Sequence, residues 1–256
     1  MLQTWLHALP FLLGAGFLTW LVSVQLRNVT IVDTLWSLMF VIAAFSYAAS
    51  TLPPGPRAQL VLVLVTVWGL RLAIYLGRRN FGHEEDRRYQ KIRRRNEPGF
   101  AWKSLYLVFG LQAVLAWVIS LPLLGAIAGD ASPLGWLDYA GAALCLVGLY
   151  FEAVGDWQLT RFKANPANAG QVMDQGLWGL TRHPNYFGDF CVWWGFGLVA
   201  LAAGAWWSLI GPALMSVLLL RVSGVTLLER DIGKRRPGYA EYIRRTNAFF
   251  PGPRRP

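Results

Sequence analysis

Long apolar stretches constrain the fold of this chain more than any other feature, because a helix needs about 20 apolar residues to cross a bilayer. Of the 256 residues, 55% are hydrophobic, which is above the usual share of a water-soluble domain. Stretches of the required length lie at Trp5–Leu26, Ile31–Thr51, Ala58–Gly77, Ser104–Ala128, Gly135–Trp157, Tyr186–Ala203 and Trp206–Leu228. The sequence therefore predicts an all-α, polytopic membrane protein with about seven transmembrane helices.

The basic residues gather between alternate apolar stretches. The chain has 24 Lys and Arg against 14 Asp and Glu, and 21 of the 24 cations lie in the connections 27–30, 78–103 and 158–185 and in the tail from residue 229. Basic connections of this kind face the cytoplasm in membrane proteins. We therefore expect a cytoplasmic C-terminus and an N-terminus outside, and we expect membrane lipid, not nucleic acid, beside the positive charge.

Several kinds of site are not indicated by the sequence. Cys145 and Cys191 both fall within apolar stretches, where a thiol behaves as a small apolar group, so neither a disulfide framework nor a metal site is expected. The chain also lacks the glycine-rich motifs of Rossmann folds and P-loops. A dinucleotide would therefore have to bind without a Rossmann fold.

The stretch from Gly176 to Asp189 is the most informative motif, reading Gly-Leu-Trp-Gly-Leu-Thr-Arg-His-Pro-Asn-Tyr-Phe-Gly-Asp. Proline suits the first turn of a helix, so we expect a membrane helix to begin at Pro184. Asn185, Asp189 and Trp193 then follow at intervals of four residues, which places them on one face of that helix.

A cation and an imidazole, Arg182 and His183, precede this expected helix. Positive groups beside free helical N–H donors form an anion site, and phosphate is the anion that proteins most often bind in this way. The alternative is a turn at the membrane interface whose Arg and His face lipid head groups. Asp189, one turn into an apolar helix, favours a buried polar site.

Polar residues also occur in the second and third stretches. Asp33 lies at the start of the second, where either the helix dipole or a substrate pocket would explain a carboxylate. Arg71 lies deep in the third, with Tyr75 one turn later on the same face. Arg71 either extends to the membrane surface or belongs to an inward-facing polar site, and the alignment with Tyr75 favours the second.

The longest connection, Arg78–Lys103, contains the run Glu-Asp-Arg-Arg-Tyr at residues 85–89 and three consecutive Arg at 93–95. Dense cations with mixed signs fit an interfacial segment that contacts anionic lipid. The alternative is a lid over a polyanionic cofactor, with Arg87 and Tyr89 among the contacts.

The later stretches carry further charged residues. Glu152 and Asp156 lie four residues apart near the end of the fifth stretch, where like charges destabilise a helix unless donors such as ribose hydroxyls or Arg side chains compensate them. Arg221 lies within the seventh stretch and Glu229 just after it, on nearly the same helical face, and Arg221 has an alternative role in a salt bridge to Asp189 or Glu152. The tail carries Tyr-Ala-Glu-Tyr at residues 239–242 and ends near a Pro-Gly pair.

The octapeptide Arg-His-Pro-Asn-Tyr-Phe-Gly-Asp at residues 182–189 resembles the C-terminal signature of the steroid 5-alpha-reductase and sterol reductase superfamily of integral membrane proteins. The chain as a whole is similar to the bacterial DUF1295 branch, in which a Glu-Asp-x-Arg-Tyr run recurs, and the tail resembles the superfamily's terminal Tyr-x-x-Tyr segment. Isoprenylcysteine carboxyl methyltransferases and phospholipid N-methyltransferases carry a related turn. The motif therefore indicates the superfamily better than the reaction.

This resemblance implies an NADPH-dependent reductase of a lipophilic unsaturated substrate, an enone or a steroid- or prenyl-like lipid, in a bacterial inner membrane. Asp33 and Arg71 would bind the substrate carbonyl. The reductases have a Tyr three residues before the comparable Arg, and this chain has Trp68 there, so Tyr75 becomes the expected proton donor. The implied cofactor contacts are Arg87, Tyr89, Asp156, Lys163, Arg182, His183, Asn185, Tyr186, Asp189, Arg221, Glu229, Tyr239 and Tyr242.

Two other functions remain open. One is an S-adenosylmethionine-dependent methyltransferase acting on lipids or isoprenylcysteine, which would need fewer phosphate-binding cations. The other is a lipid-binding membrane protein without enzymatic activity. We expect a single integral membrane domain over 1–256, with three spans and the basic loop in 1–103 and four spans, the site motif and the tail in 104–256.

Overall fold

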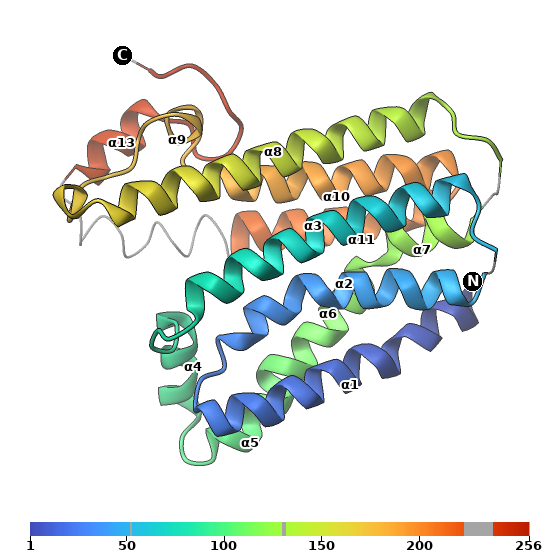
Figure 1. The fold of residues 1–256 in the computed structure, drawn as a ribbon, viewed down its shortest axis with the longest axis horizontal. Coiled ribbons are helices and arrows are strands. Elements are labelled where there is room, and N and C mark those ends of the chain that lie inside the picture. The colour runs from blue at the N-terminus through green and yellow to red at the C-terminus, as the bar shows by residue number, and fades with distance from the viewer. Residues whose placement is uncertain (52, 130–131, 223–237, 256) are drawn as a thin grey trace. The chain divides into compact units, whose positions relative to one another are not determined.

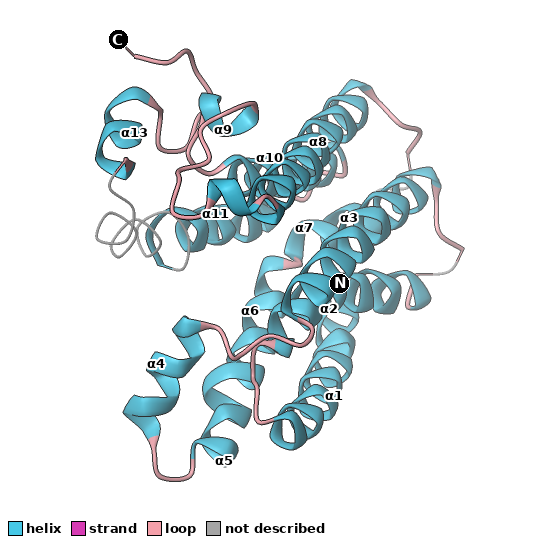
Figure 2. Cartoon of the chain, turned by 60° about the vertical axis from the view of Figure 1, so that its left-hand side comes forward, coloured by secondary structure: helices cyan, strands magenta, loops and turns pink. Residues whose placement is uncertain are grey.

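All regular structure in the computed structural model is helical within the residues it describes, which are 1–51, 53–129, 132–222 and 238–255 (Figures 1 and 2). The predicted all-α fold is thus confirmed. The longer helices are α1 (Leu2–Leu26), α2 (Ile31–Ala49), α3 (Pro56–Asn80), α4 (Arg87–Asn96), α8 (Trp136–Ala164) and α10 (Pro184–Ala202). The shorter ones are α5 (Phe100–Ser104), η1 (Leu105–Gly110), α6 (Leu111–Ile119), α7 (Leu121–Ala128), η2 (Pro166–Asn168), α9 (Leu177–Leu180), η3 (Trp206–Leu209), α11 (Ile210–Val217), η4 (Leu218–Val222) and α13 (Tyr239–Arg245).

Five helical stretches of the described chain are long and apolar enough to cross a membrane. They are Leu2–Leu26, Ile31–Ala49, Pro56–Asn80, Phe100–Ile119 and Trp136–Ala164. These stretches overlap the first five predicted spans, and they indicate a multi-pass integral membrane protein. The predicted count of seven is not confirmed.

Three of the predicted spans differ from the structure. The fourth breaks at Ser120, because Pro122 lacks the N–H that would continue the hydrogen-bond ladder, and α7 starts anew there. The sixth corresponds to α10, whose first turns carry Asn185 and Asp189 and which is not among the five apolar stretches. The seventh corresponds to the shorter apolar stretch Trp206–Val222, and its predicted end at Leu228 lies outside the described residues.

The described residues divide into two compact units, Met1–Asp138 with Val199–Gly211 and Tyr139–Leu198 with Pro212–Pro256. In the first unit, α2 and α3 approach closely at Gly69. A Cβ there would come within 2.6 Å of a Val41 methyl carbon, and the Ser37 hydroxyl donates to the Gly69 carbonyl at 2.9 Å. Trp68, next to this contact, is fully buried. The position expected for a proton-donating Tyr is therefore a core tryptophan.

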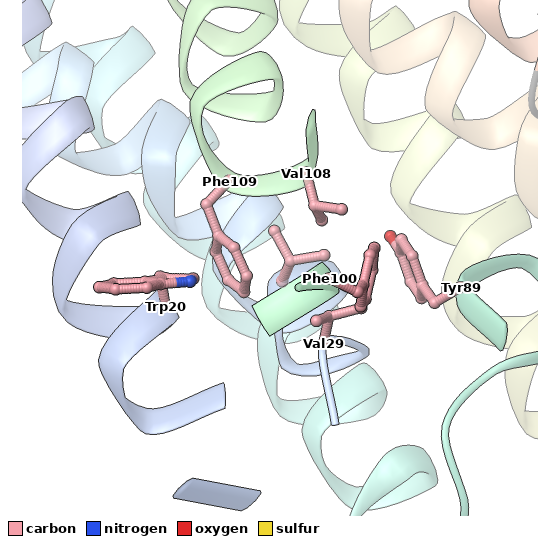
Figure 3. Close-up of a cluster of buried hydrophobic side chains, with 7 residues drawn as sticks. Trp20, Val29, Tyr89, Phe100, Val108 and Phe109 are labelled. Atoms are coloured by element: carbon pink, nitrogen blue, oxygen red, sulfur yellow. The ribbon is translucent and has the colours of Figure 1, made fainter. Parts of the chain in front are cut away.

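A hydrophobic cluster fixes the basic connection to the first two helices (Figure 3). It joins Trp20 and Val29 to Tyr89 of α4 and to Phe100 and Phe109. The Asp86 carboxylate caps α4 by accepting from the Arg88 backbone N–H at 2.8 Å. The connection between α3 and α6 therefore includes a helix that packs on the bundle.

One buried ion pair in the first unit was not predicted from the sequence. Arg57 at the start of α3 donates from Nε and Nη2 to the Asp138 carboxylate, at 2.7 and 3.0 Å, and both side chains are almost fully buried. Asp138 also accepts from the Gly135 N–H at 2.8 Å. Arg57 and Asp138 lie 81 residues apart in sequence, so helical periodicity could not predict that they pair.

Candidate functional site

The predicted site residues fall in both units. Asp33, Arg71, Tyr75, Arg87 and Tyr89 belong to the first, and the predicted cofactor contacts from Asp156 to Tyr242 belong to the second. Glu229 lies outside the described residues, as does the rest of 223–237.

Two carboxylates are buried in the part of α8 that belongs to the second unit. Glu152 is 2% exposed and Asp156 is 4% exposed, although both lie in an apolar helix. The Asn185 side-chain amide, one residue after the start of α10, lies 3.5 Å from Asp156 Oδ1 and donates toward it. The structure thus brings together two of the residues predicted to contact a cofactor, and a helix does begin at Pro184 as predicted.

Close contact between α8 and α10 makes this pairing possible. A Cβ on Gly148 would lie 2.4 Å from the Gly188 carbonyl oxygen, and a Cβ on Gly188 would lie 2.5 Å from the Gly148 oxygen. Two turns further along α8, Gly155 faces the Pro184 ring. Small residues at helix contacts let the backbones approach closely, so the glycines set how near the polar side chains of the two helices lie.

The residues before and within the first turn of α10 form a buried polar segment. His183 is buried, its backbone N–H donates to the Thr181 hydroxyl at 3.3 Å, and its ring stacks on Tyr186 with centroids 5.6 Å apart and an interplanar angle of 7°. The Tyr186 N–H donates to Asn185 Oδ1 at 3.1 Å. The Asn185 amide oxygen therefore accepts a hydrogen bond at the helix start, while its amide nitrogen donates toward Asp156.

Arg182 has a structural partner that the sequence did not reveal. Its guanidinium Nη1 donates to the carbonyl oxygens of Ile243 and Thr246 at 3.1 and 2.6 Å, at the C-terminal end of α13. Its backbone N–H donates to the Asn247 oxygen at 2.9 Å. Basic groups stabilise the unpaired carbonyls at a helix C-terminus. Arg182 thus fastens the C-terminal segment to the start of α10.

Further bonds hold the C-terminal segment against residues 174–183. The Tyr242 hydroxyl donates to the Trp178 oxygen at 2.6 Å, the Thr181 hydroxyl donates to the Phe249 oxygen at 2.8 Å, and the Gly252 N–H donates to the Leu180 oxygen at 3.1 Å. Arg254 pairs with Asp174. The tail therefore packs on the motif within the second unit.

The two predicted tail contacts, Tyr239 and Tyr242, are both buried and meet edge to face with ring centroids 5.6 Å apart. Burial raises the pKa of Tyr242 above its ordinary value. In contrast, Lys163 at the end of α8 and Arg221 in η4 are exposed, and Asp189 is half-buried on α10.

In the first unit, both carboxylate oxygens of Asp33 are bonded to residues of α4. Arg88 Nη2 donates to Oδ2 at 2.7 Å, and the Tyr89 hydroxyl donates to Oδ1 at 2.6 Å. Burial and the neighbouring Asp33 charge raise the pKa of Tyr89 well above its ordinary value. Arg88 was not among the predicted site residues, although the Glu-Asp-x-Arg-Tyr run contained the signal for it.

Glu85 and Asp86 of that run are also bonded to the turn between α1 and α2, Glu85 through its carboxylate and Asp86 through its backbone N–H, which donates to the Thr30 hydroxyl at 2.8 Å. Glu85 accepts from the Val29 N–H at 3.0 Å and takes two hydrogen bonds from Arg93, at 2.7 and 2.8 Å. Burial acts to raise the pKa of Glu85, but the bonds from Arg93 and Val29 outweigh it, so the pKa is lowered. Burial also acts to raise the pKa of Asp86, but the hydrogen bonds and the charge of Arg88 outweigh it, so this pKa is lowered as well.

Arg71 and Tyr75 lie one turn apart on α3, as expected, and both are half-buried. The guanidinium carbon of Arg79 lies 5.9 Å from the centre of the Tyr75 ring, which is a cation–π distance. Arg87, the remaining predicted contact in this unit, is exposed on α4.

The fold is that of an all-helical, multi-pass integral membrane protein with buried polar residues where α8 meets α10. The chain matches a family described as "Protein of unknown function (DUF1295)" over residues 19–246, and it belongs to this family. It is similar to "Uncharacterized protein C594.04c" of Schizosaccharomyces pombe, with 23% identity over 286 residues that cover 94% of this chain and 80% of that protein. No solved structure matches the chain significantly. The predicted family is thus confirmed.

Proposed function

We propose that the protein is a membrane-embedded, NADPH-dependent reductase of a lipophilic unsaturated substrate. The observation that carries the proposal is the burial of Glu152 and Asp156 in the second unit, with the Asn185 amide beside Asp156. Burying an ionised carboxylate is costly unless hydrogen-bond donors compensate it. Polar and ionisable residues within membrane helices mark functional sites by default.

The donor and acceptor groups of the second unit fit a dinucleotide. Carboxylates such as Glu152 and Asp156 accept hydrogen bonds from ribose hydroxyls, and Lys163 and Arg221 are exposed cations of the kind that phosphates require. The resemblance of residues 182–189 to the reductase signature supports the same cofactor. Bound NADPH would supply a hydride. The substrate contacts Asp33 and Arg71 and the proton donor Tyr75 stay predictions from the resemblance, and both carboxylate oxygens of Asp33 accept hydrogen bonds from Arg88 and Tyr89.

One observation favours a second function. Arg182 Nη1 donates hydrogen bonds to two backbone carbonyl oxygens, so this atom is not available to bind a phosphate. The candidate site is therefore less basic than the sequence predicted. S-adenosylmethionine carries no phosphate. A methyltransferase of lipids or isoprenylcysteine is therefore the alternative against which the reductase must be tested.

A ligand comparison separates the two functions. Detergent-purified protein is heated with NADPH, with NADH or with S-adenosylmethionine, and the melting temperature is recorded. A ligand present at about 100 times its dissociation constant stabilises the folded state by about 2.7 kcal/mol, which is a measurable shift. We expect the largest shift with NADPH. A shift with S-adenosylmethionine alone would establish the methyltransferase instead, and no shift with any of the three would leave the lipid-binding function.

A further inference from the structure

The basic residues of α4 are divided between two faces of the helix. Arg88 and Arg93, with Tyr89 and Ile92 between them, face the bundle, because they carry the ion pairs and hydrophobic contacts described above. Arg87, Lys91, Arg94 and Arg95 follow at positions i, i+4, i+7 and i+8, which lie on one other face. All four of these cations are exposed. We call them the outer basic face.

The inward face of α4 has its charges compensated by carboxylates. Arg88 lies 2.7 Å from Asp33 and 3.0 Å from Asp86, and Arg93 lies 2.7 Å from Glu85. The guanidinium carbon of Arg93 also lies 4.6 Å from the centre of the Phe100 ring. These contacts anchor the helix through its inward face.

The orientation of α4 matches that of a helix lying on a membrane surface. It runs across the end of the first unit at which α1 and α3 finish and α2 begins (Figure 1). Those three helices are long and apolar enough to cross the bilayer, so a helix across their ends lies along the bilayer surface.

Exposed aromatic rings lie on both sides of α4 along the chain. Phe81 in the preceding turn is 87% exposed, and Trp102 of α5 is 72% exposed. Aromatic side chains in such positions belong at the boundary between water and lipid. Together with the outer basic face, they provide an apolar and a cationic contact in neighbouring segments of the chain.

We propose that α4 binds anionic phospholipid head groups through Arg87, Lys91, Arg94 and Arg95. The occupant is a lipid of the surrounding bilayer and not a soluble anion, because the face lies along the bilayer surface between two exposed aromatic rings. The proposal also assigns Arg87 to lipid instead of to a cofactor, and it does not depend on the proposed reductase activity.

The test titrates the detergent-purified, full-length protein with short-chain phosphatidylglycerol, short-chain phosphatidylcholine or inorganic phosphate, and counts bound lipid by native mass spectrometry. The variant is Arg94→Gln/Arg95→Gln. The matched control is Arg161→Gln/Arg244→Gln, which removes two exposed cations from α8 and α13. Melting temperatures without lipid verify that both variants fold.

We expect wild type and control to bind phosphatidylglycerol more tightly than phosphatidylcholine. In the Arg94→Gln/Arg95→Gln variant the affinity for phosphatidylglycerol should fall roughly 30-fold, since each cation near an anionic surface contributes about 1 kcal/mol. Equal affinity in the variant and the control overturns the proposal. So does equal binding of the two lipids, or complete displacement of phosphatidylglycerol by inorganic phosphate.

Discussion

Arg182 has a position within a motif that suggests ligand binding, yet the structure gives its guanidinium a role in the fold. The side chain is 8% exposed and bonds to the last carbonyls of α13. Because α13 and the following segment also contact Trp178, Thr181 and Leu180, the loss of this anchor would loosen the tail next to the candidate site.

We therefore predict that Arg182→Lys lowers the free energy of unfolding by about 2 kcal/mol, because the lysine nitrogen ends one bond short of the Nη1 position and does not reach both carbonyl oxygens. The matched control is Arg244→Lys, since Arg244 is exposed on α13. Thermal melting and limited proteolysis measure the effect, and the tail of Arg182→Lys should be cut faster. Equal cleavage of the two variants would contradict the anchoring role.

The acids at the start of α4 predict a dependence of stability on pH. Glu85 and Asp86 have pKa values below their ordinary values of 4.5 and 3.8, because Arg93 and Arg88 outweigh the effect of burial. A lowered folded-state pKa contributes stability above the ordinary pKa, and this contribution is lost as the pH falls through the folded-state value.

We expect the melting temperature to fall on acidification below about pH 5, and the fall should be smaller in Glu85→Gln than in wild type. At neutral pH Glu85→Gln should melt lower than wild type, because the paired carboxylate is gone. Glu84→Gln is the control, since Glu84 is exposed next to it. Parallel pH profiles for Glu85→Gln and wild type would show that this carboxylate carries no part of the acid sensitivity.

At the residue scale, the sequence predicted correctly those site residues that lie at a helix start marked by a proline. Asn185 was placed at the start of a helix by Pro184, and it contacts Asp156. The partners of Asp33 were beyond such reasoning, because Arg88 and Tyr89 lie more than 50 residues away and reach it only when the connection folds back. The partners of Arg182 could not be predicted for the same reason, since the carbonyl oxygens that it binds lie in the tail.

At the scale of elements, the contact between α8 and α10 determines how close Asp156 and Asn185 lie. A methyl group on Gly148 would meet the Gly188 oxygen at 2.4 Å and the Val192 backbone nitrogen at 2.8 Å. These are backbone atoms, so the helices must separate to make room for a side chain.

Gly148→Ala should therefore destabilise the protein by about 2 kcal/mol, which is typical of overpacking. Gly14→Ala on α1 is the control, because no heavy atom lies within 4 Å of the added Cβ, and it should leave stability unchanged or raise it by up to about 1 kcal/mol. Thermal unfolding in detergent measures both. If Gly148→Ala is as stable as Gly14→Ala, the helices are not in the close contact described.

Proline and glycine also explain which element boundaries the sequence predicted. The start of α10 at Pro184 followed from the preference of proline for a first helical turn, whereas α3 begins at Pro56, two residues before the predicted Ala58. The break between α6 and α7 lay inside an unbroken apolar stretch, where the composition gave no boundary although Pro122 marks it. Hydropathy measures the length of a stretch and does not show whether one helix or two fill it.

At the scale of the whole molecule, the distribution of charge makes a prediction about orientation. The connection 78–103 and the turn 50–55 lie at opposite ends of α3, so they face opposite sides of the membrane if α3 spans it. The positive-inside rule assigns the basic connection to the cytoplasm.

Single-cysteine labelling in intact cells tests this orientation. A membrane-impermeant maleimide should label Pro53→Cys and spare Glu84→Cys, both of which replace exposed residues. The native Cys145 and Cys191 are buried and should react little. Labelling of Glu84→Cys but not of Pro53→Cys would reverse the predicted topology.

Direct binding of NADPH tests the central claim, which is that the polar residues between α8 and α10 receive a cofactor. The measurement is equilibrium dialysis of detergent-purified wild type, Asn185→Ala and the matched control Asn165→Ala, an exposed asparagine of the same unit. We predict saturable binding to wild type and Asn165→Ala, with affinity at least about tenfold weaker in Asn185→Ala, because Asn185 orders the helix start beside Asp156. Equal affinity in all three proteins would place the cofactor elsewhere, and no binding to wild type would contradict the reductase.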